Sequence, residues 1–104
     1  MEKLTNETFK TNVENEHLLL VDFYADWCGP CKMMHPVLED IDATNDKGLK
    51  VAQINVDEYP DIAGAYGVQS IPNLILFKDG KAVNQAIGFM NKDQLLAKIG
   101  ADLD

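Results

Sequence analysis

The only two cysteines of the chain, Cys28 and Cys31, are separated by two residues in the stretch Trp27-Cys28-Gly29-Pro30-Cys31. A pair at this spacing can close a small disulfide with little movement of the backbone. Because neither thiol has another cysteine to pair with, the pair is either a redox couple or half of a metal site.

The residues on either side of the pair place it between a strand and a helix. Residues 18–24 are nearly all apolar and predict a strand that is covered on both faces. From Lys32 to about Asp42, apolar residues recur with helical spacing. The start of a helix carries partial positive charge and unpaired N–H groups, which favour a thiolate over a thiol. A thiolate is the species that attacks a disulfide, so the position favours redox chemistry.

A metal site is the alternative to a redox pair. A closed zinc site needs four ligands, and only His17 and His35 could add nitrogen to the two thiolates. Nothing in the sequence completes such a set, so we expect no bound metal. An inert structural disulfide is the other alternative, and it does not suit a chain of the reducing cytoplasm.

Length and charge limit the classes of protein that remain. The 104 residues suit a single domain, residues 1–104, and no repeat or linker divides them. The net charge of -8 argues against binding to nucleic acid or to anionic membranes. The longest apolar runs, residues 18–21 and 74–77, are too short to span a bilayer. The first residues show no apolar signal segment, which favours a cytoplasmic location.

The rest of the chain predicts alternating strands and helices. The order β-α-β-α-β-β-α follows a weak first helix and predicts an α/β fold, with a central mixed sheet flanked by helices on both faces. The expected elements are a helix over Thr5–Val13, a strand over Val51–Asp57, a helix over Pro60–Tyr66 capped by Gly67, a hairpin of Asn73–Lys78 and Lys81–Ile87 turning at Asp79-Gly80, and a last helix from Asn91 with a capping box to Gln94.

These features together resemble the thioredoxin family, in its bacterial form, over nearly the whole chain. The matching stretches are residues 21–32, Pro36, Asn55-Val56-Asp57, Tyr66-Gly67-Val68, Ser70-Ile71-Pro72, residues 77–80 and Gly88. The resemblance implies the thioredoxin fold and a reductase of protein disulfides that is recharged by thioredoxin reductase. It implies no cofactor beyond the Cys28–Cys31 disulfide, since NADPH is used only by the partner reductase.

Within the motif we expect Cys28, at the exposed start of the helix, to be the nucleophile. Cys31 then resolves the mixed disulfide. Gly29 allows a tight turn, and Pro30 stiffens the ring where helical bonding does not yet need an N–H. Lys32 favours the thiolate.

Asp22 interrupts an apolar strand, so we expect a buried carboxylate with a raised pKa. In the family the matching residue exchanges a proton with the second cysteine. Bacterial members have a lysine where this chain has Gln53. We therefore hypothesise that His35, one helical turn beyond Cys31, or Gln53 tunes Asp22. The alternative is a His35 that simply faces solvent.

The resemblance also implies a surface for the substrate around Cys28. The matching proline, Pro72, is cis in the family and leaves the backbone of Ile71 free to pair with a substrate peptide. Small and apolar residues would let a substrate backbone approach the site. The expected contact residues are Trp27, Gly67, Ile71, Pro72, Gly88 and Phe89.

Two other functions fit the same pattern less well. A disulfide oxidase or isomerase of an oxidising compartment is disfavoured by Pro30 and by the missing signal segment. A docking module without enzymatic activity is disfavoured because both cysteines, Asp22 and Pro72 are present. We therefore predict a monomeric disulfide reductase with thioredoxin reductase and protein disulfides as partners.

Overall fold

A computed structural model describes residues 1–104 and shows a mixed sheet of five strands in the order β1-β3-β2-β4-β5. The strands β1, β3 and β2 run parallel, and β4 and β5 are antiparallel to their neighbours. Their bounds are β1 Glu2–Lys3, β2 Leu18–Tyr24, β3 Lys50–Asn55, β4 Asn73–Lys78 and β5 Lys81–Ile87.

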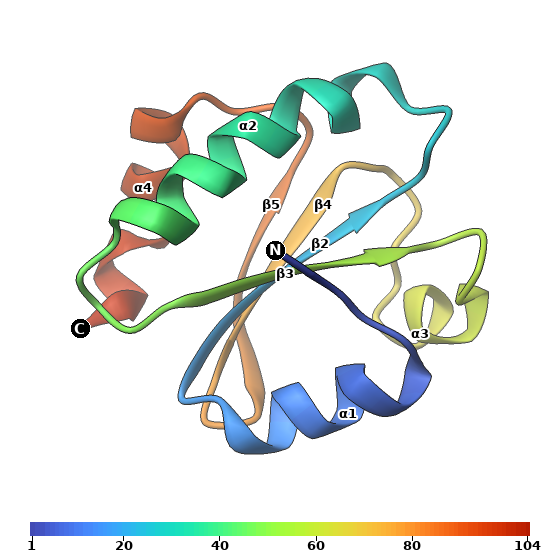
Figure 1. The fold of residues 1–104 in the computed structure, drawn as a ribbon, viewed down its shortest axis with the longest axis horizontal. Helices are drawn as coiled ribbons and strands as arrows, with labels where there is room; N and C mark the ends of the chain where they lie inside the picture. Colours follow the sequence, from blue (N-terminus) through green and yellow to red (C-terminus); the bar gives the residue numbers. More distant parts are fainter.

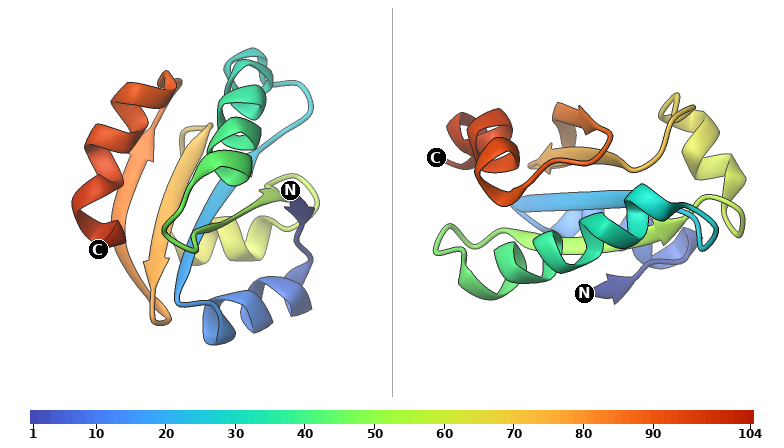
Figure 2. Two further views of the ribbon diagram at one scale, coloured as in Figure 1. Left: turned by 60° about the vertical axis from the view of Figure 1, so that its left-hand side comes forward. Right: turned by 90° about the horizontal axis from the view of Figure 1, so that it is seen from above.

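Helices cover both faces of this sheet, as predicted. They are α1 Asn6–Asn15, α2 Gly29–Thr44, α3 Pro60–Ala65 and α4 Lys92–Ile99, followed by a 3-10 turn over Gly100–Leu103. In Figure 1, α2 lies on one side of the strands and α1 on the other. Figure 2 shows α4 alongside β5.

The alternation of β2 divides the core into two layers. Leu18 and Leu20 pack with α2 and α4, whereas Leu19 and Phe23 pack with α1 and α3. Because successive side chains of a strand point to opposite faces, an unbroken apolar strand needs a helix layer on each side. None of these helices has the length and apolar character needed to cross a membrane.

Several elements differ from the sequence-based expectations. The helix α1 spans Asn6–Asn15 instead of Thr5–Val13, because Thr5 is its N-cap residue, and α3 ends at Ala65 instead of Tyr66. The strand β1 was not predicted, because two residues carry no periodic pattern and form a strand only through pairing with β3. The helix α2 begins at Gly29, not Lys32, and it continues through Pro36. The strand β3 ends at Asn55, and its polar residues Gln53 and Asn55 are buried.

Local capping signals were predicted well. Asn91 and Gln94 form the expected capping box at the start of α4. After α3, Gly67 has a φ of 66° and donates to the carbonyl of Gly64, while Val68 donates to Ala63. This pair of bonds is a Schellman motif, in which a left-handed residue satisfies the last carbonyls of a helix.

Candidate active site

The register of the sheet brings distant loops to one end of the molecule. Tyr24 pairs with Asn55, Phe23 with Asn73, and Asn73 with Ile87. The loops that follow β2, β3 and β5 and the loop that precedes β4 therefore meet at the same end of the sheet. In Figure 1 the loop after β2, the end of β3 and α3 all lie on the right-hand side of the molecule.

The two cysteines lie where α2 begins. Cys28 is the N-cap residue of α2, and the N–H of Cys31 donates to its Sγ at 3.2 Å. The two residues are joined by a disulfide, with their Cα atoms 5.2 Å apart. Only 4% of each cysteine is exposed. After reduction, the same N–H group and the helix dipole would stabilise a thiolate at Cys28.

The next two motif residues also fit the start of this helix. Gly29 is the first helical residue, and Pro30 occupies the first turn, where no backbone donor is required. A Cβ at Gly29 would meet nothing within 4 Å, so local space does not demand a glycine there. Gly29 is also not among the glycines with a positive φ, so the expected need for glycine in a tight turn is not seen at this position.

Asp22 lies on the face of β2 that is covered by α2, and only 1% of it is exposed. Its Oδ1 is buried and has no hydrogen-bond partner. Burial raises the pKa of Asp22 to about 7, because the charged carboxylate loses its hydration. This acid can therefore take up or release a proton near neutral pH.

A cavity of about 410 Å³ connects Asp22 with the second cysteine. Its lining combines acidic and basic groups with the disulfide sulfur of Cys31, from the sheet, the following loop and α2. The lining residues are Lys3, Asp22, Tyr24, Ala25, Asp26, Cys31, Lys32, His35 and Gln53. A space of this size and polarity can hold several waters, which can carry a proton between groups that do not touch.

The structure places both proposed tuning residues at this cavity. Gln53 pairs with Asp22 in the β2–β3 register, and it is buried. The Nε2 of His35 lies 2.6 Å from Oε1 of Glu39, its neighbour one turn along α2. Neither side chain forms a hydrogen bond with Asp22, so their influence on this acid stays a prediction.

The loop before β4 forms one side of the disulfide. The Ile71–Pro72 peptide bond is cis, as the family resemblance implied. The carbonyl oxygen of Ile71 lies 3.9 Å from Sγ of Cys28. The N–H of Gly88 donates to the carbonyl of Pro72 at 2.8 Å and so joins the end of β5 to this loop. Ile71, Pro72 and Gly88 are therefore brought together beside Cys28.

Trp27 directly precedes Cys28, and 71% of it is exposed. Its indole N–H donates to Oδ2 of Asp57 at 2.8 Å. The sequence interpretation included Asp57 in a matching stretch but gave it no role. Only the pairing of β2 with β3 brings residue 57 beside residue 27.

Gly67 and Phe89 are the other two residues that were expected to contact the substrate. Gly67 ends α3 with a positive φ, and Gly88 has a φ of 87° directly after β5. Phe89 follows Gly88 and is 42% exposed. No contact described here joins Gly67 or Phe89 to the disulfide, so their place in substrate binding stays a prediction.

A mixed sheet that holds a two-cysteine disulfide at a helix start, above a buried acid, defines a class: the thiol–disulfide oxidoreductases. Comparison with known proteins agrees. The Thioredoxin family model matches residues 1–101. A thioredoxin of Alicyclobacillus acidocaldarius is 46% identical over 92% of this chain and 91% of its own. A Bacillus subtilis thioredoxin is 46% identical over 89% of this chain and 88% of its own.

Solved structures give the same result. A point mutant of a thioredoxin from Halobacterium salinarum superposes with a TM-score of 0.89 at 37% identity, covering 99% of this chain and 92% of that one. A second structure is described as the basis of thiol resolution in yeast mitochondrial 1-Cys peroxiredoxin by glutathione/thioredoxin systems. It superposes with a TM-score of 0.84 at 38% identity, covering 97% of this chain and 94% of that one. The chain belongs to the thioredoxin family. It has the predicted fold, and its activity is the reduction of protein disulfides.

Proposed function

We propose that Cys28 attacks the substrate disulfide and that Cys31 completes the reaction. The observation that carries this assignment is the position of Cys28 as the N-cap of α2, with its Sγ accepting the N–H of Cys31. In the reduced protein this donor stabilises a Cys28 thiolate and gives it a lower pKa than an ordinary thiol. Cys31, one turn into the helix, has no such position.

In the first step the Cys28 thiolate forms a bond to one substrate sulfur, and the substrate S–S bond breaks. The other substrate sulfur leaves as a thiolate and takes a proton from solvent. In the second step Cys31 loses its proton and attacks Sγ of Cys28. The mixed disulfide then breaks, the second substrate thiolate leaves, and the Cys28–Cys31 disulfide remains. Two electrons pass from this chain to the substrate.

Asp22 is the proton acceptor for Cys31 in the second step. The two residues line one cavity, and Oδ1 of the acid has no hydrogen-bond partner. With a pKa of about 7, Asp22 is partly ionised at neutral pH and can remove a proton from a thiol through an intervening water. An acid with an ordinary pKa would be a much weaker base.

The substrate peptide binds beside Cys28, along the backbone of Ile71. Trp27, next to Cys28 in the chain, supplies an exposed apolar surface, and Asp57 holds its indole. The adjoining Gly67, Pro72, Gly88 and Phe89 complete the contact surface. Lys32 adds a positive charge next to Cys31 and favours thiolate formation.

Residues 1–104 form one domain that works as a monomer in the cytoplasm, with thioredoxin reductase and disulfide-bonded proteins as its partners. The curated thioredoxins at 46% identity support this setting. The chain itself needs only its disulfide, because NADPH is consumed by the reductase. No nucleic acid or membrane surface takes part, which agrees with the net charge of -8.

The test is reduction of insulin with NADPH and a bacterial thioredoxin reductase. We expect rapid NADPH consumption by the wild type and background rates for Cys28→Ser. Cys31→Ser should complete the first step only, and should therefore accumulate a covalent complex with insulin that a dithiol releases. Ala97→Ser, at an exposed position of α4, is the matched control and should keep the full rate.

The result has two informative alternatives. Turnover with a chemical dithiol but not with the reductase would retain the chemistry and contradict the proposed partner. If Cys28→Ser forms the covalent complex and Cys31→Ser does not, the roles of the two cysteines are reversed.

A further inference from the structure

Three polar residues form one row across neighbouring strands. Lys3 of β1 pairs with Gln53 of β3, and Gln53 pairs with Asp22 of β2. Residues in register on parallel strands share a face of the sheet, so all three lie on the face beneath α2. All three line the cavity that also contains Cys31. The row therefore leads from a surface cation to the buried acid.

We propose that Lys3 is a positioning residue for the proton chemistry of Asp22, acting as the cation that stabilises its carboxylate across the cavity. The inference rests on the proposed role of Asp22 as a proton acceptor. Lys3 takes no part in an ion pair with another carboxylate, whereas Lys50 is bound to Glu2. The charge of Lys3 is thus available to the cavity.

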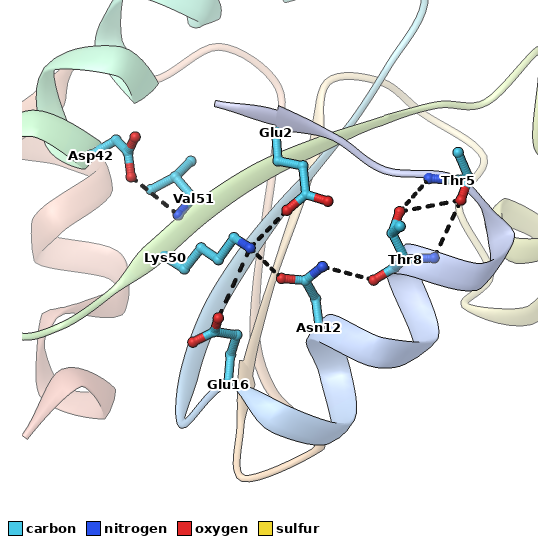
Figure 3. Close-up of polar contacts among 8 residues, drawn as sticks. All are labelled: Glu2, Thr5, Thr8, Asn12, Glu16, Asp42, Lys50 and Val51. Carbon is cyan, nitrogen blue, oxygen red and sulfur yellow. Dashed lines mark hydrogen bonds and ion pairs between the residues drawn. The ribbon is translucent and has the colours of Figure 1, made fainter.

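The position of Lys3 is held by its neighbours in the chain. The N–H of Leu4 donates to the carbonyl of Gln53 at 2.7 Å, and the Leu4 side chain is buried. On the other side, Glu2 accepts a hydrogen bond from Nζ of Lys50 at 2.7 Å. Figure 3 shows Lys50 between oxygen atoms of β1 and of the α1 region. Glu2 and Leu4 are therefore both anchored, and this keeps Lys3 beside Gln53 on the neighbouring strand.

The distance fits an action through space. Strands in a sheet lie about 4.8 Å apart, so the backbones of Lys3 and Asp22 are separated by roughly 10 Å. The four-carbon stem of a lysine covers much of this gap, and its ammonium can lean into the cavity while it stays hydrated. Gln53 lies between the two residues and is uncharged, so it does not neutralise Lys3.

Other charged or titratable groups also face Asp22, and the effect of Lys3 must be separated from theirs. From β2 and the following loop these are Tyr24 and Asp26, and from α2 they are Lys32 and His35, while Cys31 is held in the disulfide of the oxidised protein. None of them belongs to β1. A variant at residue 3 leaves all of them in place, so it isolates the contribution of this strand.

The test is an NMR titration of the Asp22 carboxyl carbon in the oxidised protein. A cation lowers the pKa of a nearby acid, so Lys3→Met should raise the midpoint, by roughly 0.5 pH units for charges at this separation near a surface. Lys3→Arg keeps the charge and should retain the wild-type midpoint. Lys10→Met removes an equal charge from exposed α1 and should also leave it unchanged.

Salt gives a second readout that needs no further substitution. High ionic strength should reduce the difference between the wild type and Lys3→Met, because exposed charges are screened. The proposal is overturned if Lys3→Met leaves the midpoint within about 0.1 unit, on the scale of that expected shift. It is equally overturned if Lys3→Arg shifts the midpoint as much as Lys3→Met, since that result assigns the effect to strand packing.

The NMR titration of Asp22 does not require catalytic turnover, so it tests the effect of Lys3 separately from the proposed role of Asp22. If the midpoint shifts as expected while the reductase activity keeps its pH profile, Lys3 acts on Asp22 but Asp22 is not the proton acceptor. If both move together, by the same number of pH units, the two proposals stand together.

Discussion

The residue that most opposes the stability of this fold is Asp22. It places a carboxylate oxygen without a partner beneath α2, on the face of the sheet where the surrounding core consists mainly of aliphatic side chains. Burial of an unpaired acid favours its neutral form, and folding then depends on pH. The redox role proposed for Asp22 explains why a stabilising apolar residue does not stand there.

This dependence on pH gives a direct prediction for stability. The pKa of Asp22 rises from 3.8 to about 7 on folding, so the folded state binds the extra proton between these values. The free energy of unfolding therefore falls as pH rises from about 4 to 7. Above pH 7 it is lower than below pH 4 by about 4 kcal/mol. Asp22→Asn cannot ionise and should remove this loss.

The measurement is urea unfolding of the oxidised wild type and Asp22→Asn at several pH values. The difference in unfolding free energy between the two proteins should grow in favour of the variant from pH 4 to pH 8. A constant offset of the variant, from its amide, does not affect this slope. A difference that is flat with pH would show that Asp22 ionises normally in the folded protein.

At the scale of elements, the ends of the helices depend on single residues. The helix α3 has only six residues, and it ends in the Schellman motif at Gly67. A Cβ at Gly67 or at Gly64 would meet nothing within 4 Å. The two glycines therefore differ in backbone conformation and not in available space.

This pair allows a matched experiment on stability. Gly67→Ala must keep a positive φ and should lose about 1 kcal/mol. Gly64→Ala, inside the helix, should gain roughly 0.5–1 kcal/mol, because alanine restricts the unfolded chain and favours the helix. Thermal or urea unfolding of both variants checks the opposite signs. Equal effects of the two substitutions would contradict the conformational explanation.

The elements with local signals were the ones that sequence could predict. The strands β2, β4 and β5 have the predicted bounds, because apolar runs and the Asp79-Gly80 turn mark them. The strand β1 has no such signal, since it exists only through pairing with residues 52–53, far along the chain. The start of α2 was placed late because the pattern of apolar residues begins after the cysteine motif.

At the scale of the molecule, the sheet places its best-buried strand in the middle. The strand β2 pairs with β3 on one side and β4 on the other, and residues 18–23 are all buried. The strand β5 pairs only with β4, and most of its residues are exposed or half-buried. We therefore expect β2 to resist local opening more strongly than β5.

Hydrogen exchange can test the order directly. Amides of β2 and β4 that pair with each other should exchange only through global unfolding, whereas those of β5 that face no partner strand should exchange roughly a hundredfold faster. Two-dimensional NMR in heavy water measures each amide separately. Uniform protection across β2 and β5 would show that the edge strand opens only with the whole sheet.

The functional site was predictable only in part, because some of its features depend on local sequence and others on which strands are neighbours. Cys28, Cys31 and Asp22 stand out in the local sequence, so they could be proposed as site residues before the fold was known. The contact of Trp27 with Asp57 and the row from Lys3 to Asp22 depend on which strands are neighbours. Sequence periodicity defines strands but not their order in the sheet, so neither feature could be found from it.

The burial of the disulfide has a consequence for which proteins can be reduced. Each cysteine is only 4% exposed, and so the attacking sulfur does not project beyond the surface that surrounds it. We therefore expect a partner to present its disulfide on an extended segment that lies against this surface. Disulfides enclosed in the core of a compact protein should therefore be reduced slowly, whatever the surrounding sequence. We therefore expect the rate of reduction to depend mainly on how accessible and how mobile the disulfide of the substrate protein is.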